Sequence, residues 1–104
     1  MSGEHVHMRT LLNSMLDASS MSDEELTTRL CYRSQIVVSR WREGLSTPPI
    51  ERLFALATIF GDHPGRWVVA YAIDQAPELR PSLIDLLSKA CLTLPDPGVA
   101  SGEA

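Results

Sequence analysis

The chain has 104 residues, of which 44% are hydrophobic, and a formal net charge of −4 at pH 7. This length predicts one small domain with a modest core, with or without a tail. No run of about 18 apolar residues is present, and the first residues lack a basic segment followed by an apolar stretch. We therefore expect neither a transmembrane helix nor a secretory signal, and a cytoplasmic protein.

The beginning of the chain is polar, and residues 1–7 are predicted to be flexible. His5 and His7 have no partner at a metal-ligand spacing, so no metal site is expected there. From Met8 to about Ser20, apolar residues recur at steps of three and four residues, which predicts a first helix. Its inward residues would be Met8, Leu11, Leu12, Met15 and Leu16.

The stretch that organises the chain follows, with the sequence MSDEELTTRLCYRSQIVVSRWREG. Ser22 followed by Glu25 forms a capping box, which predicts a short helix beginning at Asp23. Ser34 can cap a second helix, and Gly44 is a typical residue to end it. We therefore predict two short helices joined by a tight turn. Three apolar residues of the second helix are spaced to face inward: Val37, Val38 and Trp41.

The opposite face of this second helix carries polar side chains around one apolar residue: Gln35, Ile36, Ser39, Arg40 and Glu43. Gln and Arg pair bidentately with adenine and guanine in the major groove of DNA, and an apolar side chain can contact the thymine methyl group. We interpret Gln35, Ile36, Ser39 and Arg40 as candidate base-reading residues, with Gln35 and Arg40 as the principal readers. An ordinary solvated helix face is the alternative.

Candidate phosphate contacts lie beside this face. Residues 26–42 contain four arginines and no acidic residue. Arg33, Ser34 and Arg42 are placed to hold phosphates, and the N-terminus of the second helix also favours an anion. The same arginines could instead be solvated or paired with nearby carboxylates.

Three further helices are predicted beyond Gly44. Pro48 or Pro49 should begin a fourth helix that Gly61 ends. Its inward stripe would be Ile50, Leu53, Phe54, Leu56, Ala57 and Phe60. Asp62 or His63 can cap a fifth helix with Pro64 near its first position, running to about Gln75. A sixth helix should run from about residues 78–81 to 94, followed by a disordered tail over residues 95–104.

The last two helices carry more apolar surface than the preceding domain needs for its own core. Such a surface must be buried somewhere, and a two-fold dimer is an economical solution because it makes the patch self-complementary. The predicted dimerisation residues are Trp67, Val68, Tyr71, Leu83, Leu86 and Leu87.

One family shares the pattern of residues 8–64. The positions that carry the likeness are Ser22, Asp23, Glu24, Glu25, Leu26, Leu30, Ser34, Val38, Ser39, Arg40, Trp41, Gly44, Pro48, Ile50, Leu53, Leu56 and Ala57. With these residues the stretch resembles the helix-turn-helix of the lambda-repressor/Cro-like, or Xre-type, family. The stretch departs from the family pattern at two places: Cys31 stands where the turn commonly has Gly, and residues 45–47 are not basic.

The resemblance implies an all-α fold, with a lambda-repressor-like helix-turn-helix domain over residues 8–63 and a C-terminal helical dimerisation extension over residues 64–94. It implies a phage- or plasmid-type repressor that binds double-stranded DNA as a homodimer and uses no cofactor. The runner-up interpretation is an antitoxin or anti-repressor-type protein-interaction module with weak DNA binding, whose protein partner is unknown.

Catalysis and redox chemistry find little support in the sequence. His63 has no nucleophile or carboxylate at a recognisable spacing, and there is no Gly-rich phosphate loop, so we do not expect an enzyme. The two cysteines, Cys31 and Cys91, form no CxxC or Cys/His cluster. We expect both to be reduced thiols.

Overall fold

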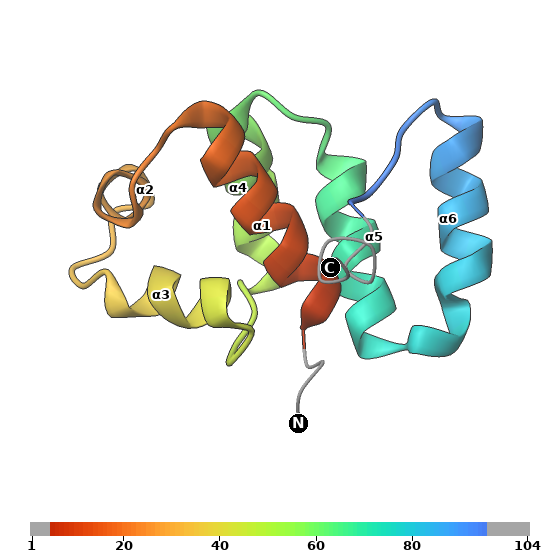
Figure 1. Ribbon diagram of the computed structural model, residues 1–104, viewed down its shortest axis with the longest axis horizontal. Helices are drawn as coiled ribbons and strands as arrows, with labels where there is room; N and C mark the ends of the chain where they lie inside the picture. Colours follow the sequence, from red (N-terminus) through yellow and green to blue (C-terminus); the bar gives the residue numbers. More distant parts are fainter. Residues whose placement is uncertain (1–4, 96–104) are drawn as a thin grey trace, which may run out of the picture.

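A computed structural model describes residues 5–95 of the chain (Figure 1). These residues form six α-helices and one short 3-10 helix, and none of them forms a β-strand. The all-α prediction is confirmed. No helix within the described range is both long and apolar enough to cross a membrane. The elements are α1 (Val6–Ser19), α2 (Asp23–Arg29), α3 (Ile36–Glu43), α4 (Ile50–Phe60), α5 (Pro64–Gln75), the 3-10 helix η1 (Pro77–Leu79) and α6 (Arg80–Lys89).

Local capping signals set most of the helix ends. The hydroxyl of Ser22 accepts a hydrogen bond from the backbone N–H of Glu25 at 3.0 Å, so α2 begins at Asp23 as predicted. His63 caps α5 in the same way, because its ring Nδ1 accepts from the N–H of Gly65 at 2.9 Å. Gly44 ends α3 in the left-handed conformation, at φ 78°.

Helix α5 packs against α1, α4, α6 and η1. It lies between α1 and α4 on one side and α6 on the other (Figure 1). The Trp67 ring is fully buried in the main core with residues of α1 to α4, and it stacks on Phe60 with ring centroids 5.8 Å apart. Its indole N–H donates to Asp62 at 3.0 Å, so the one polar atom of this large side chain is satisfied.

The core therefore differs from the prediction in one important respect. Trp67 and Ala70 of α5 belong to the same cluster as Leu11 of α1 and Leu53 of α4. The expectation that residues 64–94 are not needed for the core of residues 8–63 is wrong. The physical reason is that the inner face of α5 packs against both α1 and α4 and shares their buried cluster.

A second, smaller core joins α5 to α6. Val69 and Ile73 of α5 and Leu87 of α6 are its buried members. Trp67 and Leu87 thus lie inside the chain, and the prediction that they contribute to a dimer surface is wrong. Val68, Tyr71 and Leu83 are half-buried, whereas Leu86 is 61% exposed.

The two ends of the described range also differ from expectation. Helix α1 begins at Val6 rather than Met8, so residues 5–7 are not a flexible extension. Helix α6 ends at Lys89 rather than near residue 94, because Cys91 adopts a left-handed conformation at φ 62° and reverses the chain. From Asp96 onward, the predicted tail lies outside the described residues.

The start of α1 is held by a carboxylate from a distant helix. Asp74 of α5 accepts hydrogen bonds from the backbone N–H groups of His7 and Met8, both at 2.9 Å. The His7 ring Nδ1 lies 3.0 Å from the same carboxylate, whose side chain is only 2% exposed. Unpaired N–H groups at a helix start attract negative charge, so Asp74 replaces the local cap that α1 lacks.

On α4, the apolar residues are not all inward. Leu53, Leu56 and Ala57 are buried as predicted, but Ile50 is 51% and Phe54 57% exposed. The inward assignment of these last two residues is wrong. They lie four positions apart, on one exposed side of the helix.

Candidate nucleic-acid interface

Helix α3 presents one buried face and one open face. Val38 and Trp41 are buried, while Gln35, Arg40 and Glu43 are exposed. Ile36 is 55% exposed, which is unusual for a large apolar residue in the first turn of a helix. The candidate base-reading residues thus share the open side of α3, as the helical period requires. Their role in reading bases stays a prediction.

Ser39 is less accessible than the other candidates. It is half-buried, and its hydroxyl lies 3.5 Å from a carboxylate oxygen of Asp23. At this distance the hydrogen bond is weak, so the hydroxyl can still turn to another acceptor. Gln35 and Arg40 remain the most accessible polar side chains of the candidate set.

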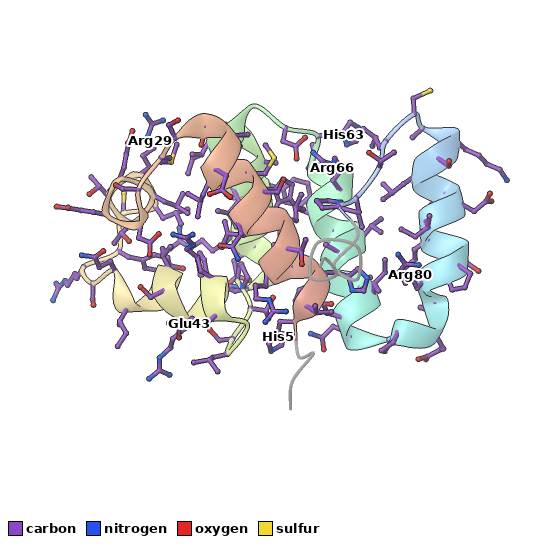
Figure 2. The ribbon with its side chains drawn as sticks, in the orientation of Figure 1. His5, Arg29, Glu43, His63, Arg66 and Arg80 are labelled. Atoms are coloured by element: carbon purple, nitrogen blue, oxygen red, sulfur yellow. The ribbon has the colours of Figure 1, made fainter. Side chains whose placement is uncertain are left out.

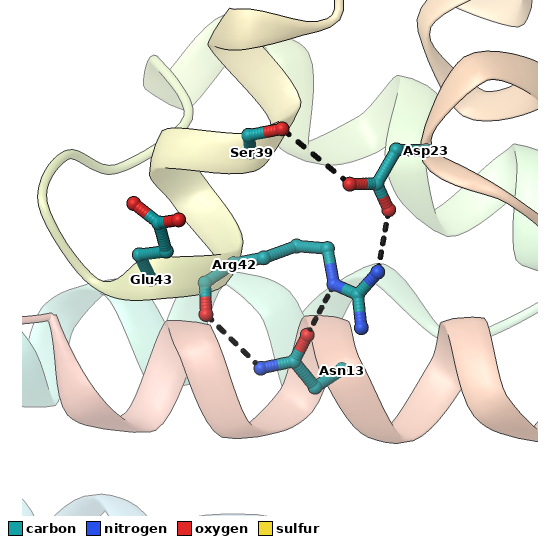
Figure 3. A pocket seen from close by; sticks show the side chains of 5 residues that line it. All are labelled: Asn13, Asp23, Ser39, Arg42 and Glu43. Atoms are coloured by element: carbon teal, nitrogen blue, oxygen red, sulfur yellow. Dashed lines mark hydrogen bonds and ion pairs between the residues drawn. The ribbon is translucent and has the colours of Figure 1, made fainter.

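Arg42 bonds side chains of two other helices (Figure 3). Its Nη1 atom lies 2.5 Å from Oδ1 of Asp23, and its Nε donates to Oδ1 of Asn13 at 2.6 Å. The amide of Asn13 in turn donates to the backbone carbonyl of Arg42 at 3.1 Å. One side chain therefore connects α1, α2 and α3. The assignment of Arg42 as a phosphate contact stays a prediction, and its guanidinium already bonds two partners within the chain.

These partners border an open polar recess of about 290 Å³, which Ser39 and Glu43 also line (Figure 3). Asn13 was not among the residues predicted for this site. It stands between apolar residues of α1 with no motif around it, and only its proximity to α3 reveals its role. One general feature of the sequence could have indicated Asn13. A polar residue at the border of the apolar face of a helix often forms a hydrogen bond to a neighbouring element.

The remaining phosphate candidates lie just before α3. Arg33 is exposed, and within residues 5–95 no carboxylate lies within ion-pair distance of it. The hydroxyl of Ser34 accepts a hydrogen bond from the N–H of Ile36 at 3.2 Å. The N-cap of α3 is nevertheless Gln35, one residue later than predicted, and its side chain makes no capping bond. Because of its bond to Ile36, the hydroxyl oxygen of Ser34 is partly used. Arg33 and the helix start remain accessible to an anion.

Two other arginines near α3 are engaged. Arg29 of α2 pairs with Glu25 one turn earlier at 3.1 Å, in an exposed position. Arg52 of α4 lies 5.0 Å above the centre of the Tyr32 ring, and Tyr32 meets Trp41 edge to face at 5.8 Å. This stack supports the buried side of α3, so the helix has a fixed position relative to α4.

Within residues 5–95 no group of three or more His, Cys, Asp or Glu side chains could hold a metal ion. Both cysteines are exposed free thiols. The arrangement around α3 is suited to recognition through hydrogen bonds and apolar contact.

Comparison of the chain with protein-family models, with curated proteins and with solved structures found no significant match.

Proposed function

We propose that this protein is a sequence-specific DNA-binding transcription regulator that inserts the open face of α3 into the major groove. In this proposal α2 and α3 form a helix-turn-helix of the lambda-repressor type. In Figure 1, α2 is seen end-on while α3 runs across the view, so the two helices cross steeply. Short helices that cross in this way are typical of the motif.

The observation that carries the proposal is the open face of α3. Gln35 and Arg40 offer the donor and acceptor groups that read adenine and guanine, and Ile36 offers an apolar surface for a thymine methyl group. The exposed apolar surface of Ile36 is unfavourable in water. Contact with a thymine methyl group would remove part of that surface from water and so favour binding. The Arg42 network and the Tyr32–Trp41 contact fix the helix that carries them, which is what base readout requires.

Regulation would follow from occupancy of an operator by a homodimer in the cytoplasm, most simply as repression. Dimers of this kind contact two half-sites about one helical turn apart. The half-buried residues Val68, Tyr71 and Leu83, and above all the exposed Leu86, remain candidates for the dimer contact.

The direct test is selection of binding sites from a random double-stranded DNA library, followed by gel shifts on the selected sequence. Arg40→Ala and Gln35→Ala should each weaken binding by about 1–3 kcal/mol and relax the preference at one base position. Arg29→Ala is the matched control, because it removes an exposed arginine from α2 that already pairs with Glu25. Equal losses of affinity for selected and random DNA would show that Gln35 and Arg40 contact phosphates and not bases.

A protein-interaction module of the antitoxin or anti-repressor type is the second candidate. It is favoured by the net charge of −4 and by three exposed apolar residues after α3: Leu45, Ile50 and Phe54. The two candidates differ in the selection experiment. If the library yields no sequence above the level obtained with the Arg40→Ala variant, the second candidate is favoured.

A further inference from the structure

A second recess lies at the opposite end of the molecule, away from α3. It has a volume of about 210 Å³ and is formed by α6 and the segment that returns after Cys91. Its apolar lining comes from Ile84 and Leu87 on α6 and from Leu92 and Leu94 on the returning segment. Arg80, one turn before Ile84, also lines it. An apolar recess with one cation is a typical arrangement for a small amphipathic ligand.

Arg80 has most of its donors available. Its Nε donates to Nε2 of His7 at 3.1 Å, and within residues 5–95 no carboxylate lies within ion-pair distance of it. A guanidinium carries five N–H donors, so the four on the two terminal nitrogens have no protein acceptor in the described range. The residue is half-buried and lies on the side of α6 that faces α5 (Figure 2).

The contact with His7 also fixes the chemistry around Arg80. Because Nε2 of His7 accepts from Arg80, the ring must donate from Nδ1, and Asp74 is the acceptor 3.0 Å away. The buried Asp74 carboxylate is thus occupied by His7 and by two backbone N–H groups. It forms no ion pair with Arg80. A half-buried cation beside apolar walls gains most from an anion that pairs with it bidentately.

We propose that this recess binds a small amphipathic monocarboxylate, with the carboxylate on the terminal nitrogens of Arg80 and the hydrocarbon chain against Ile84, Leu87 and Leu92. The volume lies below the range of about 300–1,000 Å³ usual for drug-sized ligands, so the hydrocarbon chain is short. The inference is independent of the proposed DNA binding.

The test uses the full chain without DNA. Sodium hexanoate is titrated at constant ionic strength and followed by amide chemical shifts, with hexanol as the uncharged control of equal chain length. We expect saturable shifts confined to α6 and residues 92–94, and binding of hexanol at least about tenfold weaker. Equal binding of hexanol, shifts that do not saturate, or shifts centred on α3 would overturn the proposal.

Two variants test the roles of the charge and of the space. Arg80→Met should weaken hexanoate binding at least about tenfold, whereas Lys89→Met, which removes an exposed cation from the same helix, should leave it within about twofold. Ile84→Phe keeps Arg80 but fills the recess, and it should also weaken binding. Unchanged affinity in both Arg80→Met and Ile84→Phe would overturn the proposal. The hexanoate and hexanol comparison decides the matter if either variant fails to fold.

Discussion

Arg42 near the end of α3 lies 2.5 Å from Asp23 at the first position of α2, and this ion pair joins the two helices that carry the candidate interface. The two side chains are 35% and 23% exposed, so solvent screens the pair only in part. Because Arg42 also bonds Asn13, the same contact fixes α3 against α1. The angle of the open face of α3 therefore depends on a network beneath it.

The first prediction concerns the strength of this network. Asp23→Asn and Arg42→Met should each lower the free energy of unfolding by about 1–2 kcal/mol, and the double variant should show a coupling energy of about 1 kcal/mol. Urea denaturation of the four proteins measures it. The exposed pair Glu25–Arg29, one turn apart on α2, is the matched control and should couple by about 0.3–0.5 kcal/mol. Equal coupling in the two pairs would mean that the network does not stabilise the helix pair.

The second prediction concerns the turn between α2 and α3. Cys31 is exposed and adopts φ 64°, in a region where any residue with a Cβ atom is strained. Cys31→Gly should raise the free energy of unfolding by about 0.5–1 kcal/mol, the relief of strain being offset in part by the greater freedom of glycine when unfolded. Cys31→Ala separates this effect from loss of the thiol, because it keeps the Cβ atom. Thermal unfolding of both variants checks the difference.

The third prediction concerns α5. A chain ending at Gly61 lacks Trp67 and Ala70, so it leaves the main core open and should show no cooperative unfolding transition. A chain ending at Ala76 retains α5 and the Asp74 contact with α1, and should fold with reduced stability. Circular dichroism with urea titration compares the two. A cooperative transition in the shorter chain would show that the first four helices close their own core.

The fourth prediction concerns self-association. If α6 forms the homodimer contact, Leu86→Glu should convert the protein to a monomer. The side chain is 61% exposed in the single chain, and a dimer would bury the new charge without a partner. Phe54→Glu is the matched control on α4, where the side chain is 57% exposed. Light scattering gives the mass of each variant. A monomer produced by Phe54→Glu and not by Leu86→Glu would move the interface to α4.

The fifth prediction concerns salt. Arg42 and Arg29 are paired within the chain, and residues 45–47 are not basic, so few cations remain for phosphates. The slope of log affinity against log salt should be about −0.9 for each phosphate neutralised, with only a few counted for each subunit. Gel shifts over a range of potassium chloride measure it. A slope near −10 would reveal a basic surface beyond Arg33 and Arg40.

Local signals in the sequence were sufficient for most of the helix ends. Ser22, Gly44 and His63 act through their own side chain or backbone on residues at most a few positions away. Such effects depend little on the rest of the fold, so they can be predicted from a short stretch. The open and buried sides of α3 followed from its helical period in the same way.

Tertiary placement could not be predicted in this way. Helix α4 is apolar over most of its circumference, so its period does not indicate that Ile50 and Phe54 face outward. The inward position of Trp67 depends on its packing against residues of α1 and α4, which no single segment encodes. The hydrogen-bond partners of the arginines in the candidate site also depend on tertiary packing. Arg42 and Arg40 lie two positions apart. Asn13 and Asp23 bond the first, whereas the second has no side-chain partner within residues 5–95.

The central position of α5 also bears on how the protein is made. Helix α1 finds its most extensive partner in α5, and the carboxylate that caps its start is Asp74. During synthesis, α1 leaves the ribosome long before this partner exists, and its apolar stripe of Met8, Leu11 and Leu12 stays uncovered on that side until residue 75 has emerged. The nascent chain thus completes its core late, and slow translation between α1 and α5 would prolong the interval in which chaperones can bind it.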